Sequence, residues 1–448
     1  MAGRGWGGWG GWAVGGIGAC GGRWGAKGER CGGGCDGVWG AGLLCGAAVP
    51  FEGASPRLTI VGTVSDTACF RSKLLRCMVL APAWCAAVSA WGLSPSEVAV
   101  VVNDSSPESV EIGRAYSSRR GVECVLHIST EPKETIIRPV YDREIRDSLV
   151  EQLREIDEGR RPRCLVTTKG VPLRITDELV RAASVDSELA MIPVILRGGS
   201  YPILEQRANP FFISPRVLAE RPAPALMVCR LTGYTVADAL ALVERAESAV
   251  GEGLFVVDMT AFRRLAGNVW MAEAVRRLRE AGAEVTYNSG PTFILRKESV
   301  IGYAGWGSNE ASCPERTPLF SWNPGALAAV FVSSTGRTFV EPPADWEVGS
   351  WSDDPDSFHA GTPQWLLGDL IREGVSGASG YVFEPYLRHT VHPEELFSAY
   401  LDGASLAEAF AVATPVLSWM TVVVGDPLCA PFADGAEEEA PDGGSVGE

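Results

Sequence analysis

Histidine is scarce in this chain, with four residues in 448. His127 closes an apolar segment and is expected to be structural, whereas His359, His389 and His392 lie in irregular stretches. The spacing of His389 and His392 is the nearest approach to a metal-binding motif, but without a third ligand it is weak evidence for a metal site. We therefore expect no metal and no cofactor.

Paired cysteines are missing from the body of the chain. Seven of the twelve cysteines lie before Trp91, and the other five are scattered, odd in number and without a Cys-x-x-Cys pair: Cys124, Cys164, Cys229, Cys313 and Cys429. A disulfide framework or a zinc site would need regular pairs. We expect these five to be free thiols, buried like small apolar side chains.

Basic residues are also few after residue 90, where 31 lysines and arginines accompany 51 acidic residues, a net charge of −20. Such a surface repels phosphate backbones, so we expect no nucleic-acid partner. The apolar run Cys77–Val88 is shorter than the roughly 20 residues that a spanning helix needs. We therefore expect no stable membrane span.

The first 90 residues differ from the rest in composition. Residues 1–50 hold 20 of the 52 glycines and 5 of the 14 tryptophans, so we interpret residues 1–63 as a disordered leader, as sequence upstream of the true start, or as a glycine-rich functional arm. Residues 64–90 combine a basic stretch, an apolar run and small residues before Trp91, which is typical of a signal peptide. This predicts a secreted or periplasmic protein. If the segment is instead a short buried helix, the protein is cytoplasmic.

From Glu97 onward, short apolar runs typical of buried strands alternate with helical patterns. Examples are the strand-like Val98–Val102 and Cys164–Thr168 and the helical pattern Pro139–Asp157. Repeated strand, helix, strand order predicts an α/β protein, with parallel sheets covered by helices on both faces in a Rossmann-like, three-layer arrangement.

We expect two tandem, doubly wound, mainly parallel sheets with flanking helices. The first would lie in a subdomain of residues 91–232, and the second in a subdomain of residues 233–430 that carries the candidate site. A disordered acidic tail is expected at residues 431–448, because that stretch is rich in acidic residues, glycine and proline.

Three strand-like runs of the second subdomain end in residues that could face a ligand. They are Trp306 and Ser308 after the first run, Ser333 and Ser334 after the second, and Glu384 after the third. The ligand crevice of an open parallel sheet lies beyond the carboxyl ends of its strands, so we expect these side chains to converge on one cleft. The alternative is that Trp306 only packs and Ser333 only caps its strand.

Catalysis at this cleft would need a base beside Ser333. Glu384 and the loop residue His389 are catalytic candidates, and His359 and His392 could also supply a base. Position in the sequence does not establish the distance between any of them and Ser333.

Asp186 and Glu188 form a separate candidate. An extended segment would point both carboxylates the same way, and paired carboxylates can hold a cation or share a proton. The alternative is a pair that is solvated or bound in salt bridges.

Two segments resemble those of a known family. Tyr303-Ala-Gly-Trp306-Gly-Ser308 resembles a segment that ends in His-Gly in gingipain-type cysteine peptidases, which have a caspase-like fold. Val332-Ser333-Ser334-Thr335-Gly336 resembles one with a Cys three residues before a Gly, so Trp306 and Ser333 stand in the places of the His and the Cys. An indole cannot accept a proton, and a serine needs a neighbouring base. The resemblance therefore implies the fold without the cysteine-peptidase chemistry.

The resemblance extends over residues 97–430 through weaker landmarks such as Val98–Asn103 and Gly425-Asp426-Pro427. A closer resemblance is to an uncharacterised bacterial family with the same layout, through strings such as Thr168–Arg174 and Ser184–Ala190. That resemblance implies no known activity.

We therefore expect a caspase-like-fold protein that binds a peptide, sugar or protein ligand in the cleft of Trp306, Ser333 and Glu384. The alternative is a hydrolase of altered mechanism, with Ser333 as nucleophile or with Asp186 and Glu188 as a carboxylate pair. A third possibility, intracellular signalling by a scaffold of this fold, applies if residues 64–90 are not a signal peptide.

Overall fold

The strand β1 (Val98–Asn103) shows how this sequence builds three layers. Its residues Val98, Val100 and Val102 belong to one hydrophobic core, and Ala99 and Val101 belong to another. Successive side chains of a strand point to opposite faces of the sheet. A strand that is apolar on both faces must therefore be covered by helices on both sides.

The computed structural model describes residues 91–433 except for 177–181, 203–204, 262–264, 311 and 314. These residues belong to one compact unit, Ala83–Glu448. The expected leader at 1–63, the expected signal peptide at 64–90 and most of the predicted tail at 431–448 lie outside the described residues.

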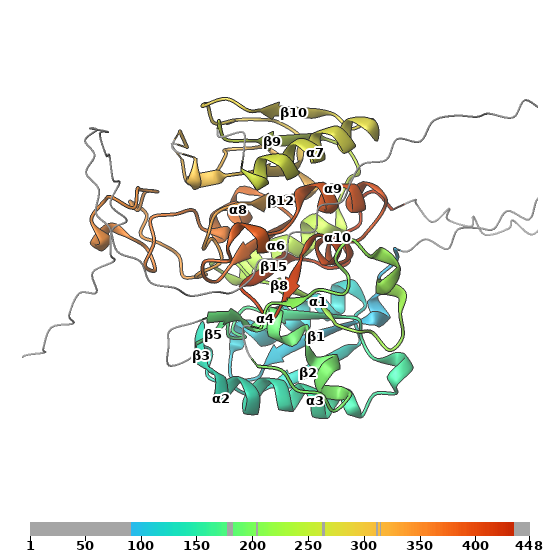
Figure 1. The fold of residues 1–448 in the computed structure, drawn as a ribbon. Coiled ribbons are helices and arrows are strands. Elements are labelled where there is room, and N and C mark those ends of the chain that lie inside the picture. The colour runs from blue at the N-terminus through green and yellow to red at the C-terminus, as the bar shows by residue number, and fades with distance from the viewer. Residues whose placement is uncertain are drawn as a thin grey trace, which may run out of the picture. The chain divides into compact units, whose positions relative to one another are not determined.

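Ten strands form one mixed, mostly parallel sheet in the order β10-β9-β11-β12-β13-β15-β8-β4-β1-β2. Neighbouring strands run parallel from β10 to β13 and from β8 to β2, whereas β15 runs antiparallel to β13. On its other side β15 meets β8 through a single residue pair, Val424 beside Arg230. In Figure 1 the labels β9 and β10 stand at the top of the view and β1 and β2 at the bottom, with β15 and β8 between them. Besides β1, the strands are β2 (Cys124–Ile128), β4 (Cys164–Thr168), β8 (Met227–Leu231), β9 (Leu254–Asp258), β10 (Val285–Asn288), β11 (Val300–Gly305), β12 (Trp322–Val330), β13 (Gly377–Tyr381) and β15 (Thr421–Gly425).

The α/β class, the mostly parallel pairing and the flanking helices are as the sequence predicts, but the prediction of two separate sheets is wrong. The strands of both expected subdomains share one sheet, because the late strand β15 lies between β13 of the second half and β8 of the first. Without it, each half would leave the backbone groups of an edge strand unpaired.

Helices cover both halves of the sheet. Helices α1, α6 and α8 pack on β1, β4, β8, β12 and β13, and α6 also contacts α1 and α8. Helices α3, α4, α7 and α10 pack on β2, β8, β10 and β15. Helix α5 packs on α3, and α9 packs on α7 and α10. The helices are α1 (Pro107–Arg120), α2 (Arg138–Val140), α3 (Asp147–Arg154), α4 (Val185–Leu189), α5 (Ile192–Leu196), α6 (Val236–Glu247), α7 (Ala266–Glu280), α8 (Leu367–Glu373), α9 (Pro393–Leu401) and α10 (Leu406–Ala413). A π-helical turn, Tyr141–Arg146, joins α2 to α3, so the helix predicted over Pro139–Asp157 runs from Arg138 to Arg154 with an irregular turn inside it.

Segments from the two halves of the chain meet beyond the carboxyl ends of the strands. Glu134, which follows β2, accepts a hydrogen bond from the backbone N–H of Phe339, which follows β12, at 2.6 Å. Arg174, which follows β4, donates to the carbonyl of Arg337 at 2.7 Å. This carboxyl edge also carries a small sheet of β3 (Thr135–Ile137), β5 (Arg174–Thr176) and β6 (Ala182–Ser184), while β7 (Arg207–Ala208) pairs with β14 (Val416–Leu417).

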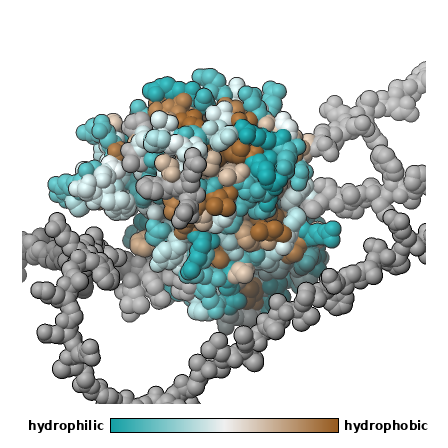
Figure 2. All heavy atoms as spheres, turned by 45° about the horizontal axis from the view of Figure 1, so that its top comes forward, coloured by the Kyte–Doolittle hydropathy of each residue, from teal (hydrophilic) through white to brown (hydrophobic). Residues whose placement is uncertain are grey.

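The surface is of mixed character. Figure 2 shows hydrophilic side chains interspersed with separate groups of hydrophobic ones on the face in view. Within the described part of the chain, no helix has the length and apolar character that crossing a membrane would require.

Candidate functional site

The strands that carry the candidate residues are neighbours. β11, β12 and β13 lie side by side, and Gly305 at the end of β11 stands opposite Val330 at the end of β12. The rings of Trp306 and Phe331, the next residue on each strand, have centroids 5.2 Å apart. The segments that carry Trp306 and Ser333 therefore follow neighbouring strands, while the expected cleft of Trp306, Ser333 and Glu384 stays a prediction.

Trp306 is held by contacts within the protein. Its indole Nε1–H donates to Asn268 Oδ1 at 2.8 Å, and its ring packs against Phe331. A methyl group built on Gly267, in the first turn of α7, would lie 2.9 Å from the indole. The half-buried indole therefore anchors α7 to the sheet. This agrees with the alternative that Trp306 packs against the protein and does not face a ligand.

Ser308 and Ser334 take part in one hydrogen-bonded network. Ser308 Oγ accepts from the backbone N–H of Trp365 at 3.0 Å, and Ser334 Oγ donates to Gln364 Oε1 at 3.1 Å. Gln364 in turn donates to Asn309 Oδ1 at 2.7 Å. Both serines thus hold the segment before α8 in place, which is a structural role.

Ser333 is the first residue of the turn after β12 and is half-buried. No hydrogen bond joins its hydroxyl to another residue in the part of the chain that the structure describes. The structure therefore places Ser333 two residues after the ring that packs on Trp306, and supplies it with no base among the described contacts.

His389 is buried and turned to another partner. Arg388 Nε donates to His389 Nε2 at 3.1 Å, so that nitrogen acts as an acceptor. Burial and the neighbouring charge of Arg388 lower the pKa of His389, which keeps the ring neutral. A histidine whose acceptor nitrogen is already used is poorly placed to take a proton from Ser333.

The other base candidates also have partners of their own. His359 Nε2 lies 3.0 Å from the carbonyl of Val340, and His392 is stacked on Trp270 with ring centroids 4.0 Å apart. Glu384 is exposed and accepts from the backbone N–H of Tyr386 at 3.0 Å, which stabilises its own turn.

Asp186 and Glu188 lie in the helix α4, so the prediction of an extended segment is wrong. Residues two apart in a helix point about 200° away from each other. Asp186 accepts from Arg230 at 2.6 and 2.8 Å, whereas Glu188 accepts from Ser418 Oγ at 2.6 Å. Each buried carboxylate has its own set of donors, and the two do not form a pair.

A cleft of about 160 Å³ at the same edge was not anticipated from the sequence. Its lining includes the residues directly after two strands, Lys169 after β4 and Thr232 after β8, and part of the segment that follows β12. Its lining includes Lys133, Lys169, Glu108, Glu134, Phe339 and Val340. The string Thr168–Arg174 was the one available signal, because it places a lysine and a glycine at the end of a strand.

The five body cysteines are all free. Cys164, Cys229 and Cys429 are buried as predicted, while Cys124 and Cys313 are only half-buried. Burial raises the pKa of Cys313 and of Cys429 to about 12. Such thiols carry little thiolate at neutral pH, which argues against a cysteine nucleophile among them.

No group of three or more metal-ligating side chains occurs among the residues that the structure describes. Comparison of the chain with family models, with curated proteins and with solved structures finds no match.

Proposed function

We propose that this chain is a ligand-binding protein of caspase-like fold that lacks cysteine-peptidase chemistry, and that its ligand is a peptide held at the carboxyl edge of the sheet. The proposal rests on the contacts of Trp306 and Ser333. The resemblance would place a base at the first position and a nucleophile at the second. Trp306 donates its only polar hydrogen to Asn268, and Ser333 has no base among its described contacts. Neither arrangement supports acyl transfer.

The adjoining cleft is the better place for the ligand than the strand ends of β11, β12 and β13 themselves. Trp306, Ser308 and Ser334 are already used in packing and hydrogen bonds. The cleft instead offers two ammonium groups. Lys133 pairs with Glu131 at 2.7 Å, whereas the ammonium of Lys169 donates to the carbonyl of Gly233 at 3.2 Å and pairs with no carboxylate in the described part of the chain.

The chemistry of the lining favours a peptide over a sugar. Lys169 and Glu108 offer charges of both signs, and the side chain of Val340 is 59% exposed. Peptides combine charged, apolar and backbone hydrogen-bonding groups, whereas sugars are usually stacked on an open aromatic face. The aromatic ring of the cleft, Phe339, is 5% exposed and offers little such face.

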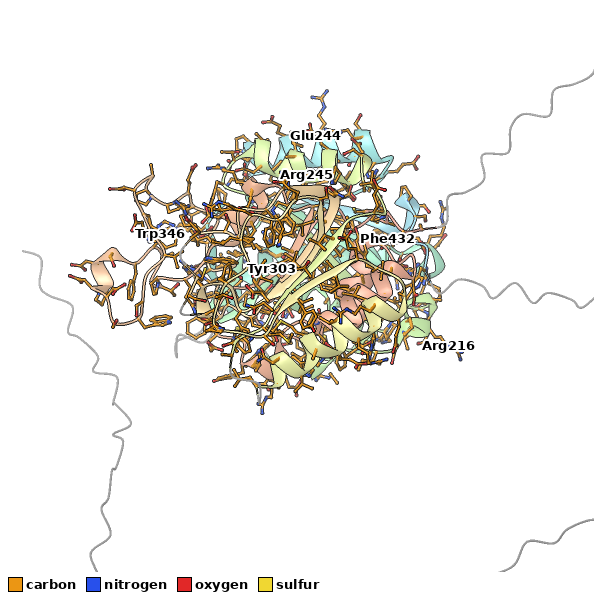
Figure 3. The ribbon with its side chains drawn as sticks, turned by 90° about the horizontal axis from the view of Figure 1, so that it is seen from above. Arg216, Glu244, Arg245, Tyr303, Trp346 and Phe432 are labelled. Carbon is orange, nitrogen blue, oxygen red and sulfur yellow. The ribbon has the colours of Figure 1, made fainter. Side chains whose placement is uncertain are left out.

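Selection of peptides from a random library on the purified protein tests this proposal. A selected peptide should bind with a Kd that rises by ~10-fold in Lys169→Met or Val340→Ser, since each removes about 1.4 kcal/mol of contact. Arg216→Met is the matched control, because Arg216 is an exposed arginine outside the cleft (Figure 3). Mass spectrometry should recover the peptide intact.

Two results would contradict the proposal. Affinity that is equal in the cleft variants and in the control would place the ligand elsewhere. Cleavage of the peptide, with loss of cleavage in Ser333→Ala and labelling of Ser333 by a fluorophosphonate, would instead support the altered hydrolase. The secreted or periplasmic location belongs to the same proposal, because it depends on residues 64–90, outside the described part of the chain.

A further inference from the structure

A second pocket, with a volume of about 50 Å³, lies where β4 and β8 begin. Arg163 directly precedes β4 and Leu226 directly precedes β8, so this pocket lies at the edge of the sheet opposite the carboxyl-edge cleft. Leucines and prolines supply its apolar lining, including Leu153, Leu196 and Leu226. Four arginines also line it: Arg161, Arg163, Arg197 and Arg221. We call it the arginine pocket.

Two of the arginines are fixed by carboxylates behind the pocket. Arg163 Nη1 donates to Glu97 at 3.0 Å and Arg163 Nη2 to Glu408 at 3.4 Å, while Arg221 also pairs with Glu97. Arg163 is 7% exposed, and its Nε–H has no hydrogen-bond partner among the described residues. A buried donor without a partner is uncommon in a native structure.

The other two arginines are positioned by carbonyl groups. Arg197 donates to the carbonyls of Ala223 at 3.1 Å and Pro224 at 3.0 Å, and no carboxylate pairs with it in the described part of the chain. Arg161 donates to the carbonyl of Leu153 at 2.9 Å and lies 3.7 Å from Glu158, whose side chain is 61% exposed. These bonds hold both guanidinium groups in place without neutralising Arg197.

The lining of the arginine pocket contrasts with the acidic balance of the rest of the protein. Residues 91–448 carry a net charge of −20, yet Glu158 is the one acidic residue among the described residues that line the arginine pocket. Guanidinium groups match carboxylates by bidentate hydrogen bonds, and an apolar wall lowers the local dielectric and strengthens that attraction. A mostly apolar wall with a few fixed polar groups is the usual lining of a small-molecule site.

We propose that the arginine pocket binds a small amphipathic carboxylate. The apolar part of the ligand packs against Leu153, Leu196 and Leu226, and the carboxylate is held by Arg161 and Arg197 at the rim. The site does not depend on the proposed peptide cleft, from which the body of the sheet separates it.

Calorimetric titration of the full-length protein with octanoate, octan-1-ol and acetate tests this inference. Octanoate should bind at least ~10-fold more tightly than octan-1-ol, which lacks the charge, or acetate, which lacks the chain. Arg161→Met and Arg197→Met should each weaken octanoate binding by ~10-fold and leave octan-1-ol unaffected. Arg216→Met, an exposed arginine outside the arginine pocket, should bind octanoate as the unmodified protein does.

A third variant separates loss of the site from loss of the fold. Leu196→Trp should fill the pocket and abolish binding of octanoate while the thermal midpoint stays close to that of the unmodified protein. The inference is overturned if octanoate shows no saturable binding, if octan-1-ol binds as tightly, or if Arg161→Met and Arg197→Met behave like Arg216→Met.

Discussion

Asp258 is the last residue of β9 and is 4% exposed. Its carboxylate accepts from the backbone N–H of Ile294 at 2.9 Å and from Asn288 Nδ2 at 3.1 Å. Burial raises the pKa of Asp258 to about 6, because desolvation of the charged form outweighs these two hydrogen bonds. The folded protein therefore holds this proton more tightly than the unfolded chain does.

Stability should respond to pH through this residue. The pKa is about 6 in the folded state and 3.8 ordinarily, so the stabilising contribution is complete below about pH 4 and is lost as the pH rises through about 6. The difference corresponds to about 3 kcal/mol. We expect the free energy of unfolding of Asp258→Asn, relative to the unmodified protein, to increase by about 2–3 kcal/mol between pH 4 and pH 8 in urea titrations. A relative stability that does not change with pH would contradict the raised pKa.

The short helix α4 is attached to the sheet by a buried ion pair. Arg230 on β8 donates to both carboxylate oxygens of Asp186, and its remaining donors reach the carbonyls of Val171 and Pro172 at 2.8 and 3.0 Å. Both side chains of the pair are 2% exposed. Such a pair adds little to folding stability compared with apolar residues of the same shape. Removing one partner, however, leaves the other charge buried without an opposite charge beside it.

Removal of one partner should therefore be worse than removal of both. We expect Arg230→Met to lower the free energy of unfolding by about 3–5 kcal/mol. Adding Asp186→Leu should recover part of that loss, and urea titrations of the two single variants and the double variant measure the coupling. Strictly additive effects would show that the pair acts as two independent residues.

At the scale of the whole molecule, β15 joins the two halves of the sheet. Val422 on β15 is 1% exposed and stands opposite Gly380 of β13, while Val424 stands beside Arg230 of β8. Because the same strand contacts both halves, opening either half exposes backbone and apolar groups of the other. The fold should thus behave as one cooperative unit.

Hydrogen exchange followed by mass spectrometry in increasing urea tests this cooperativity. Peptides from β4 and from β11 should lose their protection at the same urea concentration. Val422→Asp, which buries a charge in the linking strand, should lower that concentration equally for both. Loss of protection in β4 at a clearly lower concentration than in β11 would indicate two separately stable halves.

Local pattern in the sequence accounts for much of this fold. The strand Cys164–Thr168 has the bounds that its apolar run predicts, and β1 extends the predicted run Val98–Val102 by one residue to Asn103. The α/β class follows from the alternation itself, since it depends on neighbouring residues along the chain. The placement of Trp306 and Ser333 at neighbouring strand ends was also available from the sequence.

Only the tertiary structure decided how these elements are used. The sequence could not predict that residues 421–425 join the halves into one sheet, that Asn268 takes the indole N–H of Trp306, or that Asp186 turns to Arg230. It also gave no sign that arginines 161, 163, 197 and 221 line one pocket. Each of these depends on contacts between residues far apart in the chain, and such contacts are set by how the layers pack. Periodicity determines which residues form a strand or a helix, but the packing of distant elements determines which side chains remain available for chemistry.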